Sequence, residues 1–386
     1  MAQPALPPAY LVGAVRSAVG RRHGGLAHLH PADLGARVMQ ALVERTGVDP
    51  AEVDDVMIGN VDSVGPQGGC LARTAWLVAG FPEHVPGVTI DRRCGSSQQA
   101  IHFGAQAVMS GQADLIVAGG IQSMSQVPMM SAFVFDGDPD YDPFTTSPGW
   151  VDRYGEERFD QFSGAELIAE RWDIDRDAMD DFALESHRRA LRARNEHRFD
   201  TEIVEIDGVR HDECPREPDE TRVRSLPALR EGGRLTAAVS CSIADAASMV
   251  LVASEDAVER HDLEPLARFH HMSVTAADPI EMLSAPIPAT LRALERTGLT
   301  PDDIDLVENN EAFASVVLAW ERATGFDLDR TNVNGGAIAL GHPLGATGAR
   351  LMTTLVHELH RTGGRYGLQT MCERGGMANV TILERV

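Results

Sequence analysis

The spacing of hydrophobic residues over the first 120 positions alternates between the patterns of strands and helices. Residues 9–19 form an apolar run that predicts a strand, and residues 31–46 show helical periodicity that ends at Gly47. Similar patterns predict strands at 56–61, 88–90 and 114–118, and helices at 71–79 and after residue 94. Strands that alternate with helices predict a mostly parallel sheet covered by helices on both faces.

The pattern changes after Gly120. Residues 121–160 are rich in Met, Ser, Pro, Asp and Gly and show weak periodicity. Residues 163–198 have the periodicity of an amphipathic helix, whereas residues 199–234 are mixed and loop-like. Regular periodicity returns near Thr236, so the middle of the chain is expected to differ in structure from its two ends.

An internal repeat links the two ends of the chain. The stretch ALVERTGVDPAEVDDV at 41–56 resembles ALERTGLTPDDIDLV at 293–307, and both predict a helix, a glycine stop, a proline turn, an acidic turn and a strand. The repeat implies two similar α/β halves, roughly 1–120 and 250–386, with a segment inserted between them. Because ligands bind at the carboxyl ends of strands in such sheets, residues that follow strands are the candidates for chemistry.

Cys94 follows a predicted strand, within the stretch DRRCGSSQQAIHFGAQAVM at 91–109. A short turn and a long helix are expected next, which places the thiol at the helix N-terminus. Unpaired backbone N–H groups there stabilise a thiolate, so we expect a lowered pKa for Cys94 and a usable nucleophile near neutral pH. A lone cysteine is more often a small buried hydrophobic residue, so this interpretation depends on partners elsewhere in the chain.

Three segments in the second half place chemically active side chains after predicted strands. They are VENNEAF at 307–313 with Asn310, the glycine-rich NVNGGAIALGHPLGATGAR at 332–350 with His342, and LQTMCERGGMA at 368–378 with Cys372. Each is weak by itself, because a glycine-rich loop is usually a turn, a single histidine is often structural and an asparagine often caps a helix. Together with Cys94 they supply a nucleophile, a base, a second thiol and an amide donor.

The amino-acid composition excludes several catalytic groups and classes of binding partner. The chain of 386 residues contains no lysine, which excludes lysine Schiff bases and the P-loop lysine. Its formal net charge of −23 argues against binding to nucleic acid or acidic membranes. Its five cysteines show no CxxC pair and no zinc spacing, which suits free thiols in a reducing cytoplasm and predicts no metal site. No signal peptide and no membrane-spanning segment are expected.

These motifs make the chain resemble the thiolases, the family of acetyl-CoA acetyltransferases and 3-ketoacyl-CoA thiolases. The family motifs CxS, NEAF, GHP and CxG match CGS at 94–96, NEAF at 310–313, GHP at 341–343 and Cys372 with its glycines, and the resemblance covers essentially the whole chain. It implies the α/β thiolase fold, in which two similar βαβ-type halves pack as αβαβα layers with an inserted loop domain. The implied domains are an N-terminal half at 1–120 plus 236–260, a CoA-binding loop domain at 121–235, and a C-terminal half at 261–386.

The resemblance also implies a reaction. His342 would take the proton of Cys94, which attacks the 3-keto carbon of a 3-oxoacyl-CoA and keeps the acyl group until free CoA removes it. Cys372 would protonate the enolate of acetyl-CoA or propionyl-CoA, or remove an α-proton in the reverse Claisen condensation. One oxyanion hole would be His342 with a water held by Asn310, and the other the backbone N–H groups of Cys94 and Arg374.

The same resemblance implies the partners. Coenzyme A is expected as a co-substrate, with no permanently bound cofactor, in a cytoplasmic homodimer or homotetramer that breaks down fatty or steroid-derived acyl-CoA. The wording CGSSQQA and LQTMCERGG resembles actinobacterial thiolases of sterol and branched acyl-CoA degradation. In the arginine-rich insert, Arg216 aligns with a family CoA contact, and Cys241 and Ser242 fall where the family contacts pantetheine.

Arg374 departs from the family, which has glycine at this place in the CxG motif. The backbone N–H survives the exchange, but an arginine is costly if the position needs a positive φ. We hypothesise that Arg374 either lowers activity or contacts an acidic acyl group. Val239 and Ala246 are further departures, where the family has asparagine and glycine.

Two other functions fit parts of the pattern. A β-ketoacyl synthase of the same superfamily pairs its cysteine with two histidines, or with histidine and asparagine, and lacks the terminal cysteine motif, so Cys372 argues against it. A non-catalytic acyl-CoA-binding or carrier protein would explain the departures at 239, 246 and 374. It does not explain why Cys94, His342 and Cys372 are all present.

Overall fold

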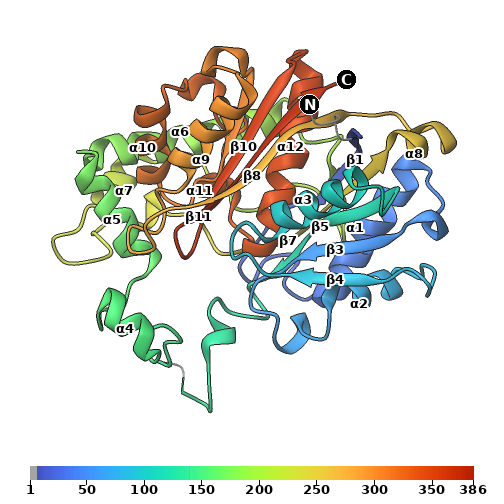
Figure 1. Ribbon diagram of the computed structural model, residues 1–386. Helices are drawn as coiled ribbons and strands as arrows, with labels where there is room; N and C mark the ends of the chain where they lie inside the picture. The colour runs from blue at the N-terminus through green and yellow to red at the C-terminus, as the bar shows by residue number, and fades with distance from the viewer. Residues whose placement is uncertain (1–6, 139) are drawn as a thin grey trace, which may run out of the picture.

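A computed structural model describes residues 7–138 and 140–386 (Figure 1). The strands are β1 (Ala9–Ser17), β2 (Gly20–Arg21), β3 (Asp55–Gly59), β4 (Gly87–Ile90), β5 (Leu115–Ser123), β6 (Ile203–Val204), β7 (Ala244–Ser254), β8 (Ala267–Ala276), β9 (Leu306–Asn309), β10 (Tyr366–Glu373) and β11 (Met377–Arg385). The helices are α1 (Pro31–Thr46), α2 (Leu71–Val78), α3 (Ser96–Met109), α4 (Pro148–Tyr154), α5 (Gln161–Arg171), α6 (Arg176–Asn195), α7 (Glu220–Ser225), α8 (Glu255–Arg260), α9 (Pro286–Thr297), α10 (Ala314–Thr324), α11 (Ala337–Leu340) and α12 (Thr347–Thr362). Within the described residues, no helix is long and apolar enough to cross a membrane.

The strands form one mixed sheet with the order β4-β3-β5-β7-β1-β8-β11-β10-β9, to which β2 and β6 add short pairings with β7 and β1. β1 and β8 join its two parts through an antiparallel pairing at Tyr10 and Leu11. β3 runs parallel to β4 and β5, and β9 runs parallel to β10. The expectation of a mostly parallel sheet is therefore wrong, because β7, β8 and β11 pair with their neighbours in the antiparallel direction and parallel pairing is confined to short stretches.

The repeated sequence corresponds to a repeated structural unit. Helix α1 is capped by Gly47 and α9 by Gly298, both left-handed with φ of 70° and 73°, and each is followed by a short 3-10 turn and a strand, β3 or β9. In the second half, the place next to β9 that corresponds to β4 is taken by an isolated bridge between Val307 and Thr331. The two ends of the chain thus share one βα pattern with a shortened edge in the second copy.

Five layers result from the packing of these elements (Figure 1). Helices α1 and α2 cover the outer face of the first part of the sheet, and α9 and α10 cover the outer face of the second part. Helices α3 and α12 lie between the two parts, where their apolar residues share one core with strands from both. This arrangement confirms the expected αβαβα thiolase fold.

The two central helices approach closely at their N-terminal ends. A Cβ atom on Gly348 of α12 would lie 2.5 Å from the Gln98 backbone nitrogen of α3. The Ser97 hydroxyl also accepts a hydrogen bond of 2.9 Å from the α12 backbone. Since α3 begins just after Cys94 and α12 just after the loop with His342, this contact brings the two loops together.

Two predicted segments differ from the structure. The strand expected at 114–118 continues to Ser123, because residues 119–123 remain paired with β7 beyond the end of the apolar run. The helical segment at 163–198 is two helices, α5 and α6, rather than one. Asp175 caps the start of α6 with its side chain, which allows a new helix to begin after the break.

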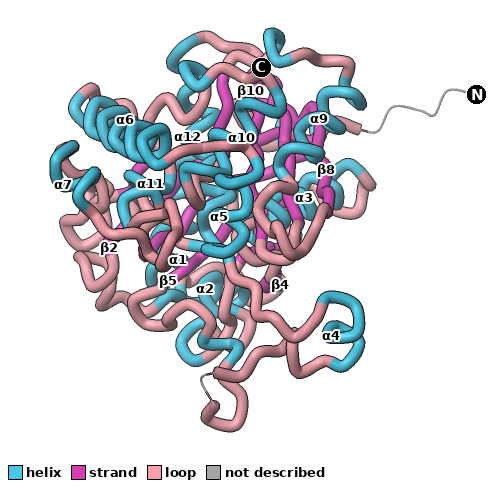
Figure 2. The backbone as a smooth tube through the Cα atoms, turned by 90° about the vertical axis from the view of Figure 1, so that its left-hand side faces the viewer, coloured by secondary structure: helices cyan, strands magenta, loops and turns pink. Residues whose placement is uncertain are grey.

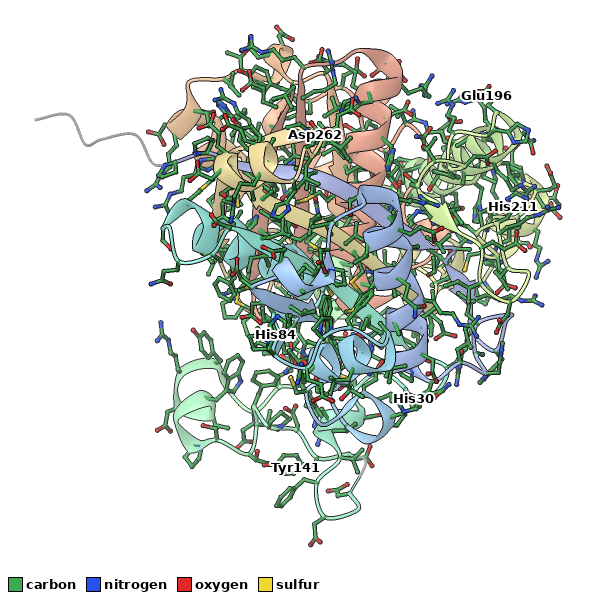
Figure 3. The ribbon with its side chains drawn as sticks, turned by 90° about the vertical axis from the view of Figure 1, so that its right-hand side faces the viewer. His30, His84, Tyr141, Glu196, His211 and Asp262 are labelled. Carbon is green, nitrogen blue, oxygen red and sulfur yellow. The ribbon has the colours of Figure 1, made fainter. Side chains whose placement is uncertain are left out.

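The segment between β5 and β7 contains the most irregular structure. Helix α4 lies apart from the sheet on a projecting segment (Figures 1 and 2), which carries Tyr141 at its tip in the side-chain view (Figure 3). The rings of Phe144, Trp150 and Tyr154 contact one another in turn at tilted angles, with centroid distances of 4.9 and 4.6 Å. The projection is therefore stabilised by its own aromatic contacts.

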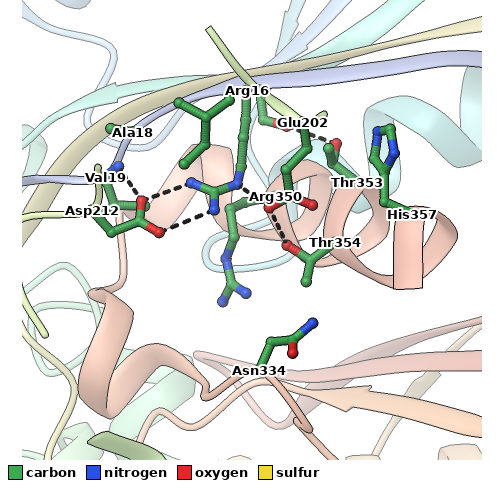
Figure 4. Close-up of polar contacts among 12 residues, drawn as sticks. Arg16, Ala18, Val19, Glu202, Asp212, Asn334, Arg350, Thr353, Thr354 and His357 are labelled. Carbon is green, nitrogen blue, oxygen red and sulfur yellow. Dashed lines mark hydrogen bonds and ion pairs between the residues drawn. The ribbon is translucent and has the colours of Figure 1, made fainter. Parts of the chain in front are cut away.

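A buried ion cluster fastens the rest of this insert to the sheet (Figure 4). Arg16 of β1 pairs with Glu202 and with Asp212, each at 2.7 Å, and all three side chains are buried. Asp212 also accepts the Val19 N–H at 2.7 Å, and Thr354 of α12 donates to Glu202 at 3.0 Å. Because separating buried charges is costly, the insert, β1 and α12 are held together as one unit.

Replacing Gly348 with alanine tests the contact between α3 and α12. The new methyl group would overlap the Gln98 backbone, so the helices must separate, and we expect the free energy of unfolding in urea to fall by about 1–3 kcal/mol. Gly149→Ala in α4 is the matched control, since a Cβ atom there meets no other atom within 4 Å. Equal stability of the two variants would contradict the importance of this contact.

Candidate active site

One cavity of about 210 Å³ lies where the loops before α3 and α12 meet. Cys94, His342 and Cys372 all line it, together with the segment 240–243 that precedes β7. Much of the remaining wall is apolar and includes Val61, Met124, Met129, Leu283 and Phe313. The structure thus brings together the three reactive side chains singled out in the sequence, although Cys372 lies within β10 rather than after it.

Cys94 does not have the lowered pKa that its place near a helix predicts. Helix α3 starts only at Ser96, and burial, followed by the Glu373 carboxylate, raises the pKa of the Cys94 thiol to about 12. The backbone N–H groups of Cys94 and Arg374 and the Arg93 guanidinium act in the opposite direction with smaller effect. The thiol is therefore protonated at neutral pH, and it would need a base in order to act as a nucleophile.

His342 is the candidate for such a base, because it lines the same cavity as Cys94. Burial, together with the Arg350 charge, lowers the pKa of His342 to about 3, so the imidazole is neutral at physiological pH. The Thr347 hydroxyl donates to the Pro343 carbonyl at 2.9 Å, which leaves its oxygen to accept from His342 Nδ1 at 2.7 Å. This pattern assigns the ring proton to Nδ1 and leaves the lone pair on Nε2.

Asn310 follows β9 and is fully buried beside the histidine. Its Nδ2 lies 3.5 Å from His342 Nε2, and its Oδ1 has no hydrogen-bond partner in the described chain. The next residue, Glu311, accepts hydrogen bonds from Ser186 at 2.7 Å and from Asn332 at 3.0 Å. This motif therefore presents an unpaired amide oxygen near the site and ties the surrounding loops together.

Two further thiols lie near Cys94. Burial raises the pKa of Cys372 well above its ordinary value and that of Cys241 to about 12, and the charge of Cys94 adds to both shifts. Ser242 lines the same cavity, and its carbonyl accepts the backbone N–H of His342 at 2.8 Å. Cys241 and Ser242 therefore border the reactive side chains directly.

Arg374 lines the cavity without the strained backbone considered for a glycine position. Its φ is not positive, and the positive φ angles fall on the next two residues, Gly375 at 93° and Gly376 at 76°. Its guanidinium lies 4.9 Å from the ring centroid of Phe133 and 5.2 Å from that of Phe144. Phe133 and Phe144, which lie between β5 and α4, therefore form cation–π contacts with this guanidinium.

Arg93 brings a second cation to the same wall. Its guanidinium lies 5.1 Å from the Phe133 ring centroid and 3.5 Å from the Asp91 carboxylate. Burial, followed by repulsion from Arg93, lowers the pKa of Arg374. The mostly apolar cavity is thus bordered by two guanidinium groups and by the Asp62 side chain.

The sequence interpretation missed three residues that shape the site. Each is a near neighbour in sequence of a residue that it identified, and this proximity was the available signal. They are Arg93 next to Cys94, Thr347 at the start of α12 and five residues after His342, and Glu373 next to Cys372.

Arg216 does not line the cavity. It lies exposed on the insert, where its backbone N–H donates to the His187 ring at 3.4 Å. Several other arginines of the insert are paired with nearby carboxylates, such as Arg189 with Glu185 at 3.0 Å. The arginine-rich insert therefore offers fewer unpaired positive charges for a polyanionic ligand than its sequence indicates.

Nitrogen-15 NMR of histidine-labelled protein tests the state of His342. Because burial holds its pKa near 3, we expect a neutral ring with its proton on Nδ1 between about pH 5 and pH 9. The signal is identified as the one that disappears in His342→Asn. An imidazolium signal at pH 5, or a proton on Nε2, would show that the ring is not prepared as a base.

Comparison with known proteins extends over both halves of the chain. Residues 9–256 match the N-terminal domain of thiolase, and residues 263–385 match its C-terminal domain. The steroid 3-ketoacyl-CoA thiolase FadA6 of Mycobacterium tuberculosis is 56% identical over 383 residues, covering 98% of this chain and 94% of that protein. The acetyl-CoA acetyltransferase of Chromobacterium violaceum is 37% identical, covering 97% of this chain and 99% of that protein.

Solved structures agree with these matches. Human mitochondrial 3-ketoacyl-CoA thiolase in complex with CoA is similar with a TM-score of 0.89 at 35% identity, covering 98% of each chain. The acetyl-CoA acetyltransferase of Bacillus anthracis has a TM-score of 0.88 at 34% identity, covering 100% of each chain. The chain therefore belongs to the thiolase family of acyltransferases.

Proposed function

We propose that this protein cleaves a 3-oxoacyl-CoA with coenzyme A, forming acetyl-CoA or propionyl-CoA and a shortened acyl-CoA. The acyl group is carried as a thioester on Cys94, and the reverse reaction is a Claisen condensation. The observation that carries this proposal is that Cys94, His342 and Cys372 line one cavity.

The first half-reaction uses all three side chains. His342 Nε2 accepts the proton of Cys94, and the sulfur attacks the 3-keto carbon. The bond between C2 and C3 breaks, which leaves the shortened acyl group on the sulfur and releases the enolate of acetyl-CoA or propionyl-CoA. Cys372 gives its proton to the enolate carbon, a role that suits a thiol whose raised pKa keeps it protonated at rest.

The second half-reaction restores the resting state. Free CoA gives its thiol proton to the Cys372 thiolate and attacks the thioester carbonyl on Cys94. Cys94 leaves as a thiolate and recovers its proton from the His342 imidazolium. No proton is gained or lost over the complete cycle, and every group returns to its neutral form.

Two sets of donors would stabilise the negative oxygen atoms that form during these steps. The backbone N–H groups of Cys94 and Arg374 both lower the pKa of the Cys94 sulfur, which supports an oxyanion hole at the thioester. Asn310 has an unpaired Oδ1 and an Nδ2 near His342, which supports a second hole with a water held by this amide.

The acyl group is proposed to derive from a steroid and to carry an acidic end. The 56% identity to a protein named a steroid 3-ketoacyl-CoA thiolase favours the first part over a fatty acyl group. The Arg374 Nε is buried without a hydrogen-bond partner in the described chain, and Arg93 adds a second positive charge nearby. A carboxylate on the acyl chain would satisfy this arginine.

Coenzyme A is the co-substrate, and we propose that the loop domain at 121–235 binds it. The N-terminal half then consists of residues 1–120 and 236–260, and the C-terminal half of residues 261–386. In this arrangement Arg216 contacts a CoA phosphate, while Cys241 and Ser242 contact pantetheine where they border the cavity. We further propose a cytoplasmic enzyme that works as a homodimer or homotetramer.

The alternative functions are not favoured. A non-catalytic acyl-CoA carrier would not need the three reactive side chains, and the chain matches relatives named for thiolase and acetyltransferase activity over nearly its full length. A β-ketoacyl synthase would have a second histidine or an asparagine in place of Cys372, which lines the cavity here.

Thiolysis of a panel of 3-oxoacyl-CoAs tests the proposed reaction. We expect CoA-dependent cleavage of a steroid-derived member, and a loss of about 10³-fold or more in Cys94→Ala. Mass spectrometry should detect an acyl adduct on Cys94 when CoA is absent. Failure to cleave any member, together with the absence of this adduct, would favour the carrier function.

Arg374→Gly tests the acidic acyl group. For a pair of 3-oxoacyl-CoAs of equal length, we expect kcat/KM to fall about 10- to 100-fold for the substrate that ends in a carboxylate, because a charged hydrogen bond is lost. The uncharged substrate should change little. Arg153→Ala on the projecting segment is the control, since Arg153 does not line the cavity. Unchanged parameters on every substrate would rule out both versions of the Arg374 hypothesis.

A further inference from the structure

Glu373 lies directly behind the nucleophile. It follows Cys372 in β10, and its side chain points to the other side of the strand. A Cβ atom built on Gly95 would lie 2.0 Å from Glu373 Oε1, so the carboxyl group packs against the residue after Cys94. Since Gly95 is the N-cap of α3, this carboxyl group lies at the N-terminal end of that helix.

Among residues 7–138 and 140–386, no cation forms a salt bridge with this carboxyl group. Glu373 is fully buried, and neither of its oxygens has a hydrogen-bond partner in the described chain. The Nε of Arg92, the nearby cation, is also buried without a partner. Burial raises the pKa of Glu373 to about 8, against the smaller effects of Arg92 and of the Asn379 N–H. Glu373 therefore keeps its proton at neutral pH.

Cys94 and Glu373 compete for the same positive surroundings. After burial, the Glu373 carboxylate is the largest cause of the raised pKa of Cys94. The partial positive charge at the N-terminus of α3 stabilises one adjacent anion, whereas two anions there repel each other. Arg92 and Arg93 face this pair from the turn after β4, and Cys372 faces it from β10.

We propose that Glu373 is a positioning residue that controls the ionisation of Cys94, so that the thiolate forms while Glu373 carries its proton. The carboxyl group takes no part in bond making or breaking. It remains neutral, so the negative charge that develops near the α3 N-terminus is the charge on sulfur. The catalytic meaning of this inference rests on the proposed function, but the ionisation of the thiol is measurable without a substrate.

The rate at which iodoacetamide alkylates Cys94 tests the proposal, measured between about pH 6.5 and pH 9.5 by mass spectrometry of the Cys94 peptide. Glu373→Gln keeps the size of the side chain and removes its charge at every pH. We expect equal rates in the two proteins near pH 6.5, and a rate about tenfold higher in E373Q near pH 9, which corresponds to lowering the thiol pKa by about one. A packing defect alone would change the rate at every pH.

Arg92→Gln is the second variant, because its loss lets Glu373 keep its proton to higher pH. Its alkylation rate should also exceed that of the natural protein near pH 9, and adding E373Q should give no further increase. Profiles that coincide with the natural protein at all pH values, or that differ from it equally at all of them, would overturn the proposal. Diverging profiles without cleavage of any 3-oxoacyl-CoA would support the ionisation control while refuting the proposed function.

Discussion

The contact between α3 and α12 is the constraint on which the active-site geometry depends. The helices come this close because Gly348 presents no side chain to the Gln98 backbone. Each helix belongs to a different half of the chain, and each is preceded by a loop that carries a reactive residue, Cys94 or His342. The cavity therefore exists only when both halves have folded and docked, and any change in the helix packing moves the thiol relative to the imidazole.

The second feature of the site is its neutrality at rest. Burial raises the pKa values of Cys94, Cys372 and Cys241 and lowers that of His342, so all four groups are uncharged when no substrate is present. A low-dielectric cavity of this kind disfavours a spontaneous thiolate–imidazolium pair. In the proposed reaction, charge would develop only as bonds change, beside the backbone N–H groups of Cys94 and Arg374 that favour a negative charge on the sulfur.

Local patterns were sufficient to predict much of the fold. The periodicity at 31–46 matches α1, and the repeat at 41–56 and 293–307 marked the two equivalent halves. The focus on residues after strands holds for Cys94, which follows β4, and for Asn310, which follows β9, whereas His342 follows the short helix α11. These inferences succeeded because helix stops, apolar runs and turn residues act over a few neighbouring positions.

Properties set by distant parts of the chain could not be predicted in this way. The pKa of Cys94 depends on burial and on Glu373, which reaches it from another strand. The cation–π contacts of Arg374 are made by Phe133 and Phe144, which lie in a stretch whose sequence shows weak periodicity. The backbone at Arg374 stays unstrained because Gly375 and Gly376 take up the positive φ angles, an adjustment that the family motif alone does not reveal.

The two halves of the chain differ in how they place their reactive residues, because the sheet edge of the second half is shortened. In the first copy the chain leaves β4, turns at Cys94 and enters α3; in the second it leaves the bridge at Thr331, turns through His342 and enters α12. The proposed nucleophile thus follows a strand directly, whereas the proposed base follows the short helix α11 and lies in the loop before α12. The proposed proton donor and its acceptor therefore come from different halves of the chain, so a chain cut to either half would lack one partner of the transfer.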